Sequence, residues 1–213
     1  MKVVVGLGNP GGEYEWSRHN AGWLALAAVA RRFAAGRFFR EGTVEAAECL
    51  RSGEKIYLLK PMGYMNRSGQ SLAAWLEYYR EIREEIRSGA GGPPDRGIDC
   101  DWPGLLVLAD DVNLPLGRLR LRPAGSSGGH NGLRDLEKAL GGPGYPRLRL
   151  GVGAAPRRLE LADHVLGRFS REEEPAILRA AETSAEAVAC WTDSGLEAAR
   201  NRFNGPDPAG ADA

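Results

Sequence analysis

The sequence lacks the features that mark secreted, membrane-bound and strongly charged proteins. It holds three cysteines in 213 residues, and their wide spacing fits neither a disulfide framework nor a metal-binding cluster. No apolar run is long enough to form a signal peptide or to cross a membrane. The 28 basic and 28 acidic residues cancel, so a polyanionic partner must meet a local basic patch. We therefore expect a cytoplasmic protein with no membrane attachment and no bound metal.

Short apolar runs alternate with amphipathic patterns, which predicts an α/β fold. A single domain over residues 1–204 should hold one mixed, mostly parallel twisted sheet with helices on both faces. Residues 88–104 are rich in glycine, proline and aspartate and should form a flexible, exposed insertion, and 205–213 a disordered tail. Strands are expected at 3–7, 43–50, 55–59, 105–109, 118–122 and 147–153, and helices at 21–34, 68–86, 131–140 and about 171–203.

The loop after the first strand carries an unusual set of polar groups. Residues 6–22 read GLGNPGGEYEWSRHNAG and contain Asn9, Tyr14 and His19, one of only three histidines in the chain. Open α/β sheets bind their ligands at the carboxyl ends of parallel strands. The loop is therefore a candidate site.

A dinucleotide-binding motif is the alternative for this loop, because Gly6, Gly8 and Gly11 spell G-x-G-x-x-G. That motif needs a helix that opens on the last glycine and an acidic residue about 20 positions later. Here the helical pattern starts only near Ala21, and the later region reads Arg31-Arg32. A tight turn that needs glycine backbone angles explains the glycines equally well, though not His19.

Three further segments bring catalytic residue types to strand ends: 60–66, 110–111 and 125–132. His19, Asn66, Asp110 and Asn131 could therefore line one cleft. A histidine with a carboxylate partner can take a proton from water, and amides can stabilise a developing oxyanion. Because the chain has no nucleophile elbow and no metal-ligand spacing, a water nucleophile is the simplest hypothesis.

Each of these residues also has a structural explanation. Asp110 could cap a turn, Asn66 could cap the next helix, and the 125–132 loop could be an anion-binding nest without catalysis. His130 fits a structural role as well as a chemical one. His164 stands in an apolar context that favours a structural role.

Arginines alternate along one expected strand. Arg118, Arg120 and Arg122 should share one face of it, and Arg134, Arg147 and Arg149 follow on the next elements. Such a face suits contacts to phosphate, which need charge and reach. A merely solvated strand face remains the alternative.

Together these segments resemble the bacterial peptidyl-tRNA hydrolases. The similar blocks follow the family's order along nearly the whole chain: GLGNPGGEYEWSRHNAG (6–22), KPMGYMNRSG (60–69), DDVNLPLGRLRLRPAGSSGGHNGL (110–133), YPRLRLGVG (145–153), DHVLGRF (163–169) and NRFN (201–204). The resemblance implies a monomeric, cofactor-free enzyme that cleaves the ester between a peptide and the 3′ ribose of tRNA. Its role would be to recycle tRNA from prematurely released peptidyl-tRNA.

The resemblance also implies residue roles. His19 is similar to the general base and Asp110 to the residue that stabilises its basic working form. Asn9 resembles the position that favours an N-blocked substrate. Other positions that resemble substrate contacts are Tyr14, Tyr64, Met65, Asn66 and Asn131, and those that resemble tRNA phosphate contacts are Arg120, Arg122 and Arg149.

The sequence departs from the family pattern at Ser17 and Gly63, where threonine is usual, and at Asn113, which replaces a common aspartate. None of these changes touches the expected His19–Asp110 pair. Two other functions stay open. A non-catalytic RNA-binding relative is opposed by the intact pair, and a small-molecule hydrolase is opposed by the arginine face.

Overall fold

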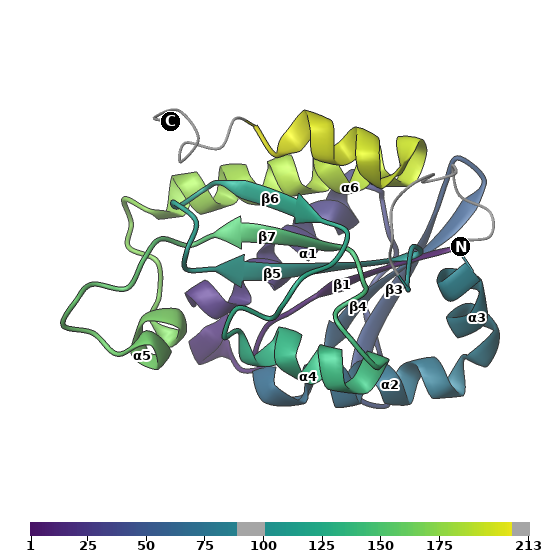
Figure 1. Cartoon of the computed structure of the whole chain (residues 1–213), viewed down its shortest axis with the longest axis horizontal. Helices are drawn as coiled ribbons and strands as arrows, with labels where there is room; N and C mark the ends of the chain where they lie inside the picture. The colour runs from purple at the N-terminus through teal and green to yellow at the C-terminus, as the bar shows by residue number, and fades with distance from the viewer. Residues whose placement is uncertain (89–100, 206–213) are drawn as a thin grey trace.

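A seven-stranded sheet lies between two layers of helices (Figure 1). The computed structural model describes residues 1–88 and 101–205. The strands are β1 (Lys2–Gly6), β2 (Phe39–Glu41), β3 (Val44–Arg51), β4 (Glu54–Pro61), β5 (Leu105–Asp111), β6 (Leu119–Arg122) and β7 (Arg147–Gly151). The helices are α1 (Ala21–Arg32), α2 (Ser68–Tyr78), α3 (Arg80–Ser88), α4 (Asn131–Leu140), α5 (Leu161–Leu166) and α6 (Glu174–Phe203), with 3-10 turns η1 (Gly12–Tyr14), η2 (Arg18–Asn20) and η3 (Met65–Arg67).

The strand order is β2-β3-β4-β1-β5-β7-β6. The central strands β4, β1, β5 and β7 are parallel, whereas β3 and β6 run antiparallel to their neighbours. This arrangement confirms the prediction of a mixed, mostly parallel sheet in an α/β fold. Among the described helices, none combines the length and the hydropathy that a membrane crossing requires.

Two hydrophobic cores cover the two faces of the sheet. Val4 contributes to the core formed with α1 and α6, and its neighbours Val3 and Val5 contribute to the core formed with α2, α3 and α4. Both faces of β1 are therefore buried, which explains its continuous apolar run. In Figure 1, α5 stands apart from both layers, beyond the arrowheads of β5 and β7.

Several predicted elements differ from the observed ones. The helix expected over 68–86 is two helices, because Tyr79 between α2 and α3 has non-helical angles (φ −103°, ψ 63°). The last helix, α6, breaks at Gly195 (φ 87°, ψ 172°). β5 runs two residues further than expected, so Asp110 belongs to the strand itself. β2 and α5 were missed, since three and six residues are too short to show a period.

The expected exposed insertion at 88–104 needs correction at its end. Trp102 is buried, and its backbone N–H and that of Asp101 both donate to the carbonyl of Gly144. The N–H of Gly104 donates to the carbonyl of Ile86. The part of the expected insertion over 102–104 therefore belongs to the core, whereas 89–100 and most of the expected tail, 206–213, lie outside the described residues.

Glycines at the end of β1 serve packing more than turning. A Cβ on Gly6 would lie 2.7 Å from the carbonyl oxygen of Gly22, and one on Gly8 would overlap the ring of Trp23. Only Gly11 of the three motif glycines has a positive φ, at 118°. Since α1 begins at Ala21, well after Gly11, the dinucleotide alternative is wrong.

Replacing Gly22 should separate α1 from the sheet. A Cβ there would lie 2.5 Å from the carbonyl oxygens of both Leu7 and Leu108, and backbone atoms cannot yield as a flexible side chain does. We expect Gly22→Ala to lower the free energy of unfolding by about 1–3 kcal/mol in urea titrations. Gly12→Ala is the control, because nothing lies within 4 Å of its Cβ position. Equal stability of the two variants would contradict this packing argument.

Candidate active site

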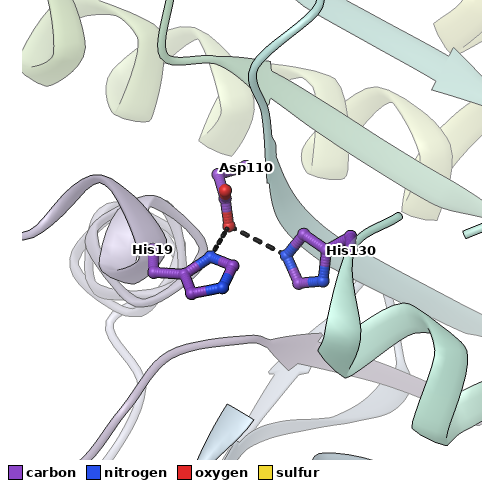
Figure 2. A group of neighbouring side chains, drawn as sticks. All are labelled: His19, Asp110 and His130. Atoms are coloured by element: carbon purple, nitrogen blue, oxygen red, sulfur yellow. Dashed lines mark hydrogen bonds and ion pairs between the residues drawn. The ribbon is translucent and has the colours of Figure 1, made fainter. Parts of the chain in front are cut away.

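The carboxylate of Asp110 binds two imidazoles at once (Figure 2). Its Oδ1 lies 2.8 Å from His19 Nδ1 and 2.8 Å from His130 Nε2. Asp110 is near the end of β5 and only 2% exposed, and both histidines are buried as well. Three segments far apart in sequence thus meet at a single oxygen atom.

The protonation state of His130 follows from its position before α4. Its Nδ1 accepts hydrogen bonds from the backbone N–H groups of Gly132 and Leu133, at 3.1 and 3.2 Å. A ring nitrogen that accepts carries no proton. The proton of His130 is therefore on Nε2 and is donated to Asp110, so His130 is a neutral helix cap and a partner of the carboxylate at the same time.

His19 completes the arrangement from the turn η2, directly before α1. An ionised carboxylate can only accept, so Nδ1 of His19 donates to Asp110. Its Nε2 then carries the lone pair, and Figure 2 shows this nitrogen pointing away from Asp110. Burial by itself raises the pKa of the Asp110 carboxyl, but the two imidazoles beside it hold that pKa well below its usual range. Asp110 is therefore an anion throughout the neutral pH range.

A cavity of about 280 Å³ opens beside the two histidines. Its polar lining includes His19, Asp110, Asn131 and Arg149. Its apolar wall consists of Val112 and three residues from α5, namely Leu161, Ala162 and Val165. The cavity therefore combines an imidazole with an apolar surface.

A second group of expected residues lies around Asn9. The side-chain oxygen of Asn9 accepts from the N–H of Met65 at 2.7 Å, which leaves its amide NH₂ available to a ligand. The side chain of Asn20 bonds both the N–H and the C=O of Asn9. Met65 lies against the start of α4, since a Cβ on Gly132 would come within 2.5 Å of its sulfur. Asn9 is therefore bonded to a residue that packs against the start of α4, directly after His130.

Other expected contacts lie outside the lining of this cavity. Tyr14 is half-buried in η1, Tyr64 is 61% exposed before η3, and Asn66 is exposed within η3. Arg67 is the residue that caps the start of α2, so Asn66 is not a helix cap. These side chains are open to an extended ligand.

The structure places the expected arginines of β6 and β7 on one face of the sheet but buries one of them. β6 places Arg120 across from Arg149 and Arg122 across from Arg147, so the four share one face of the sheet. Arg147 is fully buried, and its guanidinium binds the carbonyls of Pro143 and Tyr145. Arg147 is therefore structural and does not extend the patch.

Arg149 is partly engaged within the chain. It pairs with Asp111 at 3.2 Å and donates to the carbonyl of Ser126 at 2.7 Å. These two contacts hold its guanidinium at the cavity edge. Arg120 is half-buried and Arg122 is exposed at the edge of the sheet.

His19, Asp110 and His130 could also hold a metal by distance alone, because their ligand atoms lie within 4.8 Å of one another. A metal on His130 Nε2 would require a proton on Nδ1. That proton would face the N–H groups of Gly132 and Leu133. The donor set therefore does not fit a metal while His130 caps α4.

Sequence reasoning missed the double role of His130, the support of Asn9 by Asn20, and α5. Asn20 stands beside His19 in the sequence, and that adjacency was the available signal. His164 is buried in α5 with Nε2 3.0 Å from the carbonyl oxygen of Gly153, which fits the structural role expected for it.

Known proteins resemble this chain over nearly its full length. The model of the family described as peptidyl-tRNA hydrolase matches residues 3–87 and 97–210. The peptidyl-tRNA hydrolase of Rhodopirellula baltica is 38% identical over 204 residues, covering 96% of this chain and 97% of that protein. The one from Halalkalibacterium halodurans is 40% identical over 211 residues, covering 96% and 100%. A crystal structure of peptidyl-tRNA hydrolase from Acinetobacter baumannii has a TM-score of 0.80 and 30% identity, covering 98% and 96%. This chain belongs to the peptidyl-tRNA hydrolase family.

Proposed function

We propose that this chain cleaves the ester between the peptide and the 3′ ribose of peptidyl-tRNA, with water activated by His19. Hydrolysis would recycle tRNA from prematurely released peptidyl-tRNA. The observation that carries the proposal is the shared Asp110 oxygen, which leaves the lone pair of His19 on Nε2 beside the cavity. Family membership supplies the substrate class.

In the proposed mechanism His19 Nε2 takes a proton from water as the water attacks the ester carbonyl. The imidazolium that forms is stabilised by the Asp110 anion, 2.8 Å from Nδ1. The proton then goes to the leaving ribose hydroxyl. His130 stays neutral, because its Nδ1 remains occupied by two amides of α4.

The carboxamides bind and polarise the substrate in this proposal. Asn131 lines the cavity, where its amide can donate to the developing oxyanion. Asn9 presents its NH₂ group to a peptide carbonyl, because its oxygen is already bonded to Met65. Tyr14, Tyr64 and Asn66 contact more distant parts of the substrate, and Met65 forms part of the peptide cleft.

The tRNA is held by charge. Arg120, Arg122 and Arg149 share one face of the sheet, and Arg149 also lines the cavity. Such groups bind phosphates without reading the base sequence. Because the chain has no net charge, this local face supplies the attraction. We further propose a monomer that acts in the reducing cytoplasm, in keeping with the free thiols of Cys49 and Cys190.

Replacing His19 tests the proposal directly. We expect His19→Ala to fold and bind tRNA normally but to lose hydrolysis of N-acetyl-aminoacyl-tRNA by about a hundredfold or more. Single-turnover assays beside unblocked aminoacyl-tRNA measure both catalysis and selectivity. His164→Ala is the matched control, since its ring is buried outside the cavity lining. A His19→Ala rate above about a tenth of wild type would refute general-base catalysis by this residue.

Replacing Asp110 should reduce turnover and change how the free energy of unfolding depends on pH. Asp110→Asn keeps an acceptor oxygen but removes the charge that stabilises protonated His19, so kcat should fall by about tenfold or more. Because folding lowers the pKa of Asp110, its charge stabilises the fold above pH 3.8, and this stability is lost as the pH falls further. The difference in the free energy of unfolding between wild type and Asp110→Asn, measured by urea titration, should therefore become smaller as the pH falls below 3.8. Unchanged turnover together with a pH-independent gap would place Asp110 outside the mechanism.

The arginine face should matter for tRNA and not for the ester. Replacing both Arg120 and Arg122 with glutamine should weaken binding of peptidyl-tRNA and reduce the salt slope by about one unit per lost contact. Cleavage of a short peptidyl-adenosine ester should barely change.

The control replaces Arg31 and Arg32 with glutamine, because both are exposed at the end of α1 on the opposite side of the sheet. Equal losses on both substrates would assign Arg120 and Arg122 to the cavity instead. No loss on either would leave this face as a solvated strand edge.

A further inference from the structure

We infer that Arg18 and Glu173 form a clamp that positions the imidazole of His19 and ties it to α5. This inference rests on the proposed role of His19. It names two positioning residues that do not themselves line the cavity and that act through His19.

The guanidinium of Arg18 contacts a carboxylate, a backbone carbonyl and an aromatic ring. Its Nη2 lies 2.8 and 2.6 Å from the two carboxylate oxygens of Glu173, and its Nη1 donates to the carbonyl of Arg168 at 2.7 Å. The guanidinium also lies over the ring of Phe169. Only 12% of the Arg18 side chain is exposed, so water screens these contacts weakly.

The backbone adds a second set of contacts between the same segments. The N–H of Arg18 donates to the carbonyl of Gly167, and the N–H of Phe169 donates to that of Trp16. Ser17 forms a bridge with Arg168. Residues 16–18 are therefore joined to 167–169 by hydrogen bonds on both sides of Ser17, two residues before His19.

The clamp reaches the cavity from two directions. On one side Arg18 is covalently followed by His19 in η2. On the other side Gly167 directly follows α5, whose Leu161, Ala162 and Val165 form the apolar wall. The partner carboxylate of Glu173 is fixed in turn, since it accepts from the N–H of Ser170 and precedes α6.

The two histidines bonded to Asp110 are held in place by different contacts. His130 is held independently by the amides of α4, whereas η2, which carries His19, is held by the clamp. Loss of the clamp should loosen the His19 bond and leave the His130 bond in place. A residue that only stabilised the fold would affect both bonds alike.

The experiment uses Arg18→Gln and Glu173→Gln in the full chain. With ¹⁵N-labelled histidine, the three ring systems give separate NMR signals. We expect the Nδ1–H signal of His19 to weaken or exchange faster, with the Nε2–H signal of His130 retained. In folded protein kcat should fall by about tenfold or more, with a smaller change in KM, because misplacing a catalytic group lowers the rate. Arg18→Lys should recover only part of the loss.

Arg31→Gln is the matched control. Arg31 pairs with Glu182 and so also joins α1 to α6, but both side chains are more than half exposed. The control should keep both histidine signals and wild-type kcat. If Arg18→Gln fails to fold, Glu173→Gln gives the same readout.

Three results are decisive. Normal kcat and an unchanged His19 signal in the clamp variants would overturn the inference, as would a fall in kcat with the His19 signal intact. Parallel loss of both histidine signals would assign Arg18 to general stability and overturn it as well. If instead His19→Ala remained active, the proposed function would fail, whatever the clamp variants did.

Discussion

One buried oxygen atom of Asp110 organises this structure. A carboxylate that is 2% exposed needs compensation for the water it has lost, and here two neighbouring imidazoles supply it at the same oxygen atom. Because His130 also caps α4, its proton position is set by the helix. Asp110 and α4 together therefore determine which way the protons point. His19 lines the cavity and keeps the lone pair on Nε2, which points away from Asp110 (Figure 2).

Close backbone packing brings these groups to the same end of the sheet. Gly22 lets α1 approach β1 and β5 so closely that a single methyl group would collide with two carbonyls. The turn that carries His19 is thereby placed beside the end of β5. Gly132 does the same for α4 and Met65. Small residues in this chain thus set distances between elements, and the polar residues beside them form the candidate site.

Much of the fold could be predicted because the pattern of apolar residues in a segment indicates both its secondary structure and which of its faces are buried. The apolar run of β1 and the pattern of α4 predicted their types, and α4 its bounds as well. The convergence of His19 and Asp110 followed from strand ends. The sequence could not predict that His19 and His130 bind the same oxygen of Asp110, because only interatomic distances show this. Trp102 was assigned to an exposed insertion because its neighbours are glycine, proline and aspartate, yet a single aromatic side chain suffices to join a segment to the core.

The arginines show why composition alone predicts partners poorly. Three arginines make contacts within the chain: Arg147 binds carbonyls in the core, Arg149 pairs with Asp111, and Arg18 pairs with Glu173. Of these three, Arg149 and Arg18 hold segments close to the cavity, whereas Arg147 stabilises the start of β7. The zero net charge does not describe how charges are arranged locally. Near the site, Asp111 and Glu173 are each paired with an arginine. Arg122, by contrast, is exposed at the edge of the sheet. The net charge of a chain therefore does not show which of its arginines are exposed and which are paired within the fold.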